Sequence, residues 1–129
     1  MSLIVNHLEQ YTFEAQTRNH VIHCDQPATS GGADHGMTPT EIFVAALGLS
    51  IGVYIEHFCR ARNLPGEKFS IHLDWELEEN PTRVSKITAC IHLPHEIPER
   101  YREALRHAAE SCPLEHTLKA APKIEVQIG

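Results

Sequence analysis

The sequence lacks the motifs that mark metal-binding, secreted and nucleic-acid-binding proteins. Its four cysteines form no CxxC pair and its ten histidines form no HExxH motif, so we expect no metal and no other cofactor. Only 11 basic residues stand against 17 acidic ones, for a net charge of −6, which argues against a nucleic-acid partner. No basic start is followed by an apolar stretch. We therefore expect a cytoplasmic protein with reduced cysteines.

A membrane span is not expected either, although one long stretch carries no charge. Residues 42–55 are 14 consecutive uncharged positions, which rise only about 21 Å as a helix, against the roughly 20 residues that a bilayer needs. We predict a soluble core helix from Thr38 to Arg62, buried on all sides. Its start, Thr38-Pro39-Thr40-Glu41, is typical of a capping box, with Pro39 as the first helical residue and Glu41 reaching back.

Small residues on this helix raise the question of what it packs against. Ala45, Gly48, Leu49 and Gly52 fall on one face, and a helical glycine costs up to about 1 kcal/mol relative to alanine. Either the glycines relieve local crowding inside one domain, or they form a seam with another helix, such as one across a dimer.

The rest of the chain predicts one α+β domain, residues 1–129, with a mainly antiparallel sheet. Alternating apolar residues indicate strands, and helical spacing precedes and follows the Cys112-Pro113 break. Asn63-Leu64-Pro65-Gly66 is typical of a helix stop. Read in order, the elements are β-β-α-β-β-α-α-β. The predicted strands lie within 3–16, 19–25, 69–78, 84–93 and 123–128, and the predicted helices span 38–62, 98–110 and 114–121.

Cys112 is the cysteine best placed for chemistry. If Pro113 begins a helix, Cys112 is its N-cap, where free N–H groups favour a thiolate. An inert buried cysteine is the equally open alternative. Cys24 and Cys90 lie in predicted strands and are interpreted as packing residues, while Cys59 faces away from Ser50 on the helix.

The remaining candidates do not form a catalytic group by themselves. Arg18 is either a surface charge or a guanidinium that binds an oxyanion beside a thiol. Ser50, Tyr54 and His57 share a helical stripe, but Ser50 and His57 are separated by roughly 10 Å of rise, too far for a nucleophile and its base. Ser50 also lacks a G-x-S-x-G elbow, so acyl transfer is disfavoured.

Six short motifs stand in order along the chain. They are Arg18-Asn19-His20, Asp25-Gln26-Pro27, Gly31-Gly32-Ala33-Asp34, Thr38-Pro39-Thr40-Glu41, Ala45-Ala46-Leu47-Gly48 and Ser111-Cys112-Pro113-Leu114. In this order and spacing, across residues 10–128, they resemble the OsmC/Ohr family. The resemblance implies an intertwined homodimer, with a sheet wrapped around a buried central helix pair and two sites at the dimer interface.

The family includes thiol-dependent peroxidases whose site is an arginine, a glutamate and two cysteines. By this resemblance Arg18 matches the arginine and Cys112 the second cysteine. Ser50 stands where the first cysteine is expected, and Thr40 where the glutamate is expected. A serine hydroxyl has no reversible oxidation chemistry, so the two-cysteine cycle cannot run through Ser50.

Two functions follow from this departure. The first is a stress-related relative that binds a small apolar or anionic molecule, with Ser50, Thr40 and Tyr54 as binding residues and Arg18 as the charge. The alternative is a hydroperoxide reductase of the oxidative stress response, in which Cys112 and Arg18 are catalytic and a dithiol is the reductant.

Overall fold

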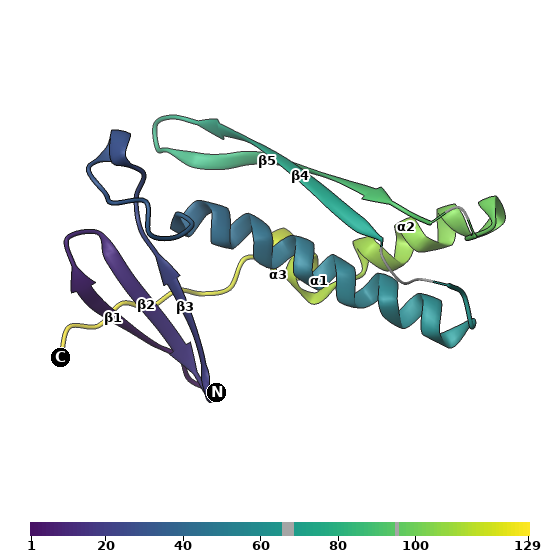
Figure 1. The fold of residues 1–129 in the computed structure, drawn as a ribbon, viewed down its shortest axis with the longest axis horizontal. Coiled ribbons are helices and arrows are strands. Elements are labelled where there is room, and N and C mark those ends of the chain that lie inside the picture. The colour runs from purple at the N-terminus through teal and green to yellow at the C-terminus, as the bar shows by residue number, and fades with distance from the viewer. Residues whose placement is uncertain (66–68, 95) are drawn as a thin grey trace. The chain divides into compact units, whose positions relative to one another are not determined.

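The computed structural model describes residues 1–65, 69–94 and 96–129. Gly66, part of the predicted helix stop, lies outside these residues. The chain divides into two compact units, Met1–Val44 and Ala45–Gly129, and one long helix continues through the boundary (Figure 1). The elements confirm the predicted α+β class with antiparallel sheets.

The first unit is built on a three-stranded antiparallel sheet. Strands β1 (Ile4–Glu9), β2 (Thr12–Thr17) and β3 (His20–Cys24) follow each other in space as in sequence, and a short 3-10 helix, η1 (Ala28–Ser30), comes after them. Ala15 pairs with both Val5 and Ile22, so these three side chains share one face of the sheet. The strands predicted within 3–16 and 19–25 are confirmed.

Helix α1 (Pro39–Ala61) begins at the predicted capping box. The Thr38 N–H donates to Glu41 Oε1 at 2.9 Å, and the Glu41 N–H donates to Thr38 Oγ1 at 3.2 Å. Two N–H groups that the first turn leaves without helical partners are thereby satisfied.

The prediction that α1 is buried on all sides is wrong for the single chain. Ile51 and Ile55 are buried, but Leu49 is 72% exposed and Val53 53% exposed, because one chain covers only one side of the helix. By length and composition alone α1 could cross a membrane. A core helix passes the same test, and the buried side of α1 fits that explanation.

The two glycines of α1 face the chain's own second hairpin, which favours local crowding over a helix seam. A Cβ on Gly48 would lie 2.5 Å from Leu73 Cδ1, and one on Gly52 would lie 3.7 Å from Ile71 Cδ1. Both contact residues belong to β4 (Ser70–Glu78), which pairs antiparallel with β5 (Arg83–His92).

The second unit joins this hairpin to α1 and to two short helices. These are α2 (Arg102–Glu110), which follows the 3-10 helix η2 (Glu99–Tyr101), and α3 (Pro113–Lys119). The hairpin and both helices were predicted within a few residues. The buried core of the unit consists of Leu47, Ile51, Ile55, Phe58, Cys59, Ile97, Leu105, Ala109 and Cys112.

The predicted final strand, residues 123–128, is not formed. This segment has no assigned secondary structure, and its apolar side chains Ile124, Val126 and Ile128 are 83%, 87% and 98% exposed. A strand needs a neighbouring strand for its hydrogen bonds, and within the described residues none pairs with it. The observed order is therefore β-β-β-α-β-β-α-α.

Candidate functional site

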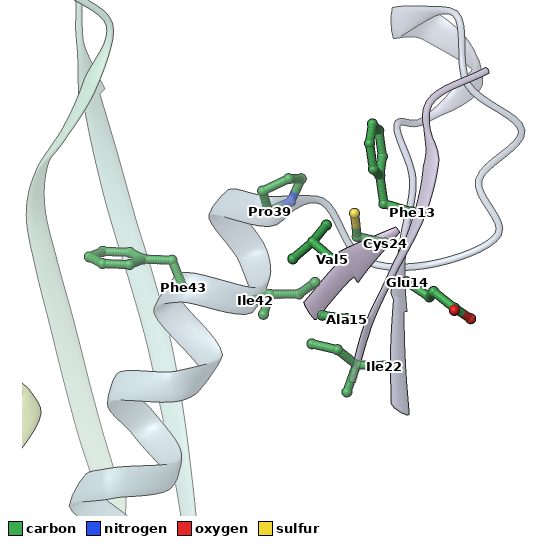
Figure 2. A pocket seen from close by; sticks show the side chains of 9 residues that line it. All are labelled: Val5, Phe13, Glu14, Ala15, Ile22, Cys24, Pro39, Ile42 and Phe43. Carbon is green, nitrogen blue, oxygen red and sulfur yellow. The ribbon is translucent and has the colours of Figure 1, made fainter. Parts of the chain in front are cut away.

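The first unit contains an apolar cavity of about 500 Å³. Figure 2 shows its two walls: the face of the sheet that carries Val5, Ala15 and Ile22, and the first turns of α1. Such a volume lies within the range of small-molecule sites. The lining residues are Val5, Phe13, Glu14, Ala15, Ile22, Cys24, Pro39, Ile42 and Phe43.

The carboxylate among these residues does not make the cavity polar. Glu14 points away from it in Figure 2. On the opposite face of the sheet its Oε1 accepts hydrogen bonds from Asn6 Nδ2 at 3.3 Å and from Gln16 Nε2 at 3.1 Å, and His23 Nε2 lies 3.8 Å from its Oε2. The cavity is therefore suited to a neutral, apolar molecule.

A buried carboxylate organises the loop between the two cavity walls, and it is not among the residues predicted to form a site. Asp25 is only 1% exposed. Its Oδ1 accepts the Gln26 N–H at 2.7 Å, and its Oδ2 accepts the N–H groups of Ala33 at 3.3 Å and His35 at 3.1 Å. The available sequence signal is an aspartate directly after a strand and just before a glycine-rich loop.

These bonds decide the charge of Asp25. Burial by itself would raise its pKa, but the backbone hydrogen bonds and one from the Thr12 hydroxyl outweigh burial, so the pKa of Asp25 lies below its ordinary value. The N–H groups of Ala33 and His35 are both used in these bonds. The loop also requires Gly32, where a Cβ would lie 1.9 Å from the Gln26 carbonyl oxygen.

Cys112 is the N-cap of α3, as predicted, and it is fully buried. Its side chain is 0% exposed and belongs to the core that contains Ile55 and Leu105. Its Sγ accepts the Glu115 N–H at 3.4 Å. This environment favours the inert-cysteine interpretation, because peroxide must reach the sulfur in order to react.

The other cysteines differ from one another in environment. Cys59 is 1% exposed, and burial together with nearby Glu56 raises the pKa of its thiol. Cys24 is half-buried at the cavity wall. Cys90 is exposed, so its interpretation as a packing residue is wrong: its side chain projects from the solvent-facing side of β5.

The predicted binding residues do not line the cavity. Thr40 is half-buried in the first turn of α1, and Ser50 is half-buried further along the same helix. Tyr54 packs against the core, with its ring 5.8 Å from that of His57. Arg18 is exposed in the β2–β3 turn of the first unit. Since Cys112 belongs to the second unit, the pairing of Arg18 with Cys112 stays a prediction.

His20, His23, Cys24 and His35 all lie in the first unit, in β3 and the loop that follows it. Across residues 1–65, 69–94 and 96–129, no three His, Cys, Asp or Glu side chains are grouped so that they could hold a metal ion.

Comparison with known proteins identifies the family. The model of the OsmC-like protein family matches residues 31–127, while no curated protein matches in sequence.

Three solved structures share the fold. A protein from Psychrobacter arcticus 273-4, described as an osmotic stress induced and detoxification response protein, has a TM-score of 0.85 at 18% identity, over 91% of this chain and 87% of its own. The organic hydroperoxide resistance protein OsmC from Legionella pneumophila has a TM-score of 0.65 at 18% identity, over 92% and 90%. A Vibrio cholerae protein, described as an organic hydroperoxide resistance protein with captopril in one active site, has a TM-score of 0.69 at 12% identity, over 94% and 86%. From the family match over most of its length, the chain belongs to the OsmC-like protein family.

Proposed function

We propose that this protein is a stress-related OsmC-like protein that binds a small, neutral, apolar molecule and does not act as a two-cysteine peroxidase. One observation carries the second half of the proposal. Of the two positions that the family's peroxidases fill with cysteine, position 50 holds serine and Cys112 is 0% exposed.

The chemistry of a peroxidase explains why this observation matters. A thiolate must attack one peroxide oxygen, so that the O–O bond breaks and the sulfur becomes a sulfenic acid. A serine hydroxyl does not form such a species. Cys112 does carry a sulfur atom, but it is packed among core side chains and its Sγ already accepts the Glu115 N–H.

The cavity of the first unit supports the binding half of the proposal. Val5, Ala15 and Ile22 present carbon to it from the sheet, and Glu14 is turned away. Its apolar lining favours a neutral ligand over an anion, since an anion would lose its hydration without gaining a charged partner. Captopril in an active site of the Vibrio cholerae protein shows that a protein of this fold can hold a small molecule.

A second candidate function is a thiol-dependent hydroperoxide reductase with Cys112 and Arg18 as catalytic residues. The N-cap position of Cys112 favours it, because helix N-termini stabilise thiolates. In that reaction the thiolate would take one oxygen from the hydroperoxide and release an alcohol. A dithiol would then reduce the sulfenic acid and release water.

We also propose that the protein works as a cytoplasmic homodimer. The exposed apolar side chains of α1, Leu49 and Val53, support a second copy as the missing cover. The apolar segment 123–128 supports it too, because it has the alternating pattern of a strand and pairs with no strand among the described residues. The four cysteines are free, and free thiols are usual for proteins of a reducing compartment.

Binding is tested with a neutral fluorescent probe, N-phenyl-1-naphthylamine, and a matched pair of variants. Ile22 lines the cavity and pairs with Ala15, whereas its neighbour Val21 lies on the other face of the same strand. The wild type is expected to bind the probe saturably. Ile22→Trp should weaken binding by at least about tenfold by filling the cavity, and Val21→Trp should leave it unchanged. Absence of saturable binding by the wild type would refute this function.

A further inference from the structure

Asp25 holds together the two ends of the loop between β3 and α1. These ends, Cys24-Asp25 on one side and Met37 on the other, are called the neck of the loop. Cys24 forms a parallel bridge with Met37, and the Asp25 N–H donates to the Met37 carbonyl oxygen at 3.2 Å. The side chain of Asp25 then holds the loop from inside, through the N–H groups of Ala33 and His35. One residue thus fixes both the neck and the body of a loop that runs from 26 to 37.

This neck connects the two walls of the cavity. Cys24 belongs to the sheet wall and directly precedes Asp25, while Pro39 belongs to the helix wall and follows Met37 by two residues. All of these residues lie in the first unit. The separation of the strand end from the helix start, and with it the width of the cavity, is therefore set where Asp25 holds the chain.

We propose that Asp25 is a positioning residue that fixes the spacing of the cavity walls and thereby the affinity of the cavity for its ligand. This inference rests on the proposed binding function. Asp25 itself does not line the cavity and acts through the loop.

The ionised carboxylate is needed, not merely a side chain of its shape. Its two oxygens accept three backbone N–H groups in a buried position. An asparagine has one acceptor oxygen, and its NH2 group would face N–H donors, so at least one buried N–H would lose its partner. The nearby titratable group is His35, whose Nδ1 lies 3.8 Å from Asp25 Oδ2.

The test compares Asp25→Asn with Asp34→Asn. Asp34 is an exposed residue of the same loop with φ of 57°, a conformation that asparagine also adopts. We expect Asp25→Asn to weaken binding of N-phenyl-1-naphthylamine by at least about tenfold. In the same variant the amide NMR signals of Ala33 and His35 should move and the backbone NOE between Cys24 and Met37 should be lost. Asp34→Asn should keep the wild-type affinity.

The outcomes distinguish a failure of the positioning role of Asp25 from a failure of the proposed binding function. Wild-type affinity in a folded Asp25→Asn variant would overturn the positioning role. If the wild type does not bind the probe, the proposed function fails, and an unchanged Cys24–Met37 NOE in Asp25→Asn would also overturn the role of Asp25 in holding the two ends of the loop together. If Asp25→Asn does not fold, the wild type is titrated with acid: affinity that persists after the Asp25 carboxyl is protonated would overturn the inference, and affinity lost together with the Ala33 and His35 signals would support it.

Discussion

At the scale of single residues, the charge of Asp25 links the loop to the stability of the fold. Because the pKa of Asp25 is lower in the folded chain than its ordinary value of 3.8, the unfolded chain binds the proton more readily. The carboxylate therefore contributes stability that is fully present above its unfolded pKa and is lost as the pH falls through the folded pKa.

Asp25→Asn should remove this contribution. We expect the melting temperature of the variant to lie below that of the wild type at pH 7, and the difference to shrink as the pH falls through the folded pKa of Asp25. Thermal unfolding followed by circular dichroism between pH 7 and acid measures it. Asp34→Asn provides the control, and a difference that grows toward acid would contradict the account.

The two glycines of α1 should respond differently to alanine. At Gly52 the added Cβ meets Ile71 Cδ1 at an ordinary 3.7 Å, so Gly52→Ala should stabilise the fold by about 0.5–1 kcal/mol through helix propensity. At Gly48 it would lie 2.5 Å from Leu73 Cδ1, and Gly48→Ala should be less stable than Gly52→Ala by about 1–3 kcal/mol. Urea unfolding of both variants measures this, and equal effects would refute the packing against β4.

The sequence predicts the role of a residue where that role depends on its neighbours in the chain, and it does not where the role depends on distant contacts. The N-cap position of Cys112 follows from Pro113 alone, and the structure confirms it. Its complete burial does not follow, because the surrounding core comes from α1 and α2 as well. Asp25 was missed for the same reason, since two of its hydrogen-bond donors stand eight and ten residues further along the chain.

At the scale of elements, the start of α1 depends on the capping box. Thr38→Ala removes the oxygen that accepts the Glu41 N–H, and we expect it to lower the free energy of unfolding by about 1 kcal/mol. Thr38→Ser keeps the hydroxyl, so its free energy of unfolding should stay within about 0.5 kcal/mol of the wild-type value. Urea unfolding compares the two variants, and identical losses would show that the hydroxyl is not the cause.

Strands whose pairing partner is adjacent in sequence were predicted well. The β4–β5 hairpin has alternating apolar residues on both sides of one turn, and its partner strand is adjacent in sequence. The segment 123–128 has the same alternation but no adjacent partner, so its pattern predicts a strand that the single chain does not form. The exposed side of α1 is a similar case. Its apolar pattern predicts that it is buried but does not identify the segment or chain that buries it.

At the scale of the whole molecule, the exposed apolar side of α1 predicts self-association. Leu49 is 72% exposed, so Leu49→Glu places a charge where the single chain has solvent but a dimer would have a buried contact. We expect the wild type to run as a dimer in size-exclusion chromatography with light scattering, and Leu49→Glu to run as a monomer at the same concentration. His107→Glu, at an exposed position of α2 and away from this helix, should stay dimeric. A monomeric wild type would contradict the proposal.

The central claim is that serine at position 50 and a buried Cys112 leave no working peroxidase site. Consumption of cumene hydroperoxide by the purified protein with dithiothreitol tests this most directly. The account predicts a rate no higher than that of dithiothreitol alone, for the wild type and for Cys112→Ser. Saturable consumption by the wild type that Cys112→Ser abolishes would contradict the claim and establish the single-cysteine reductase instead.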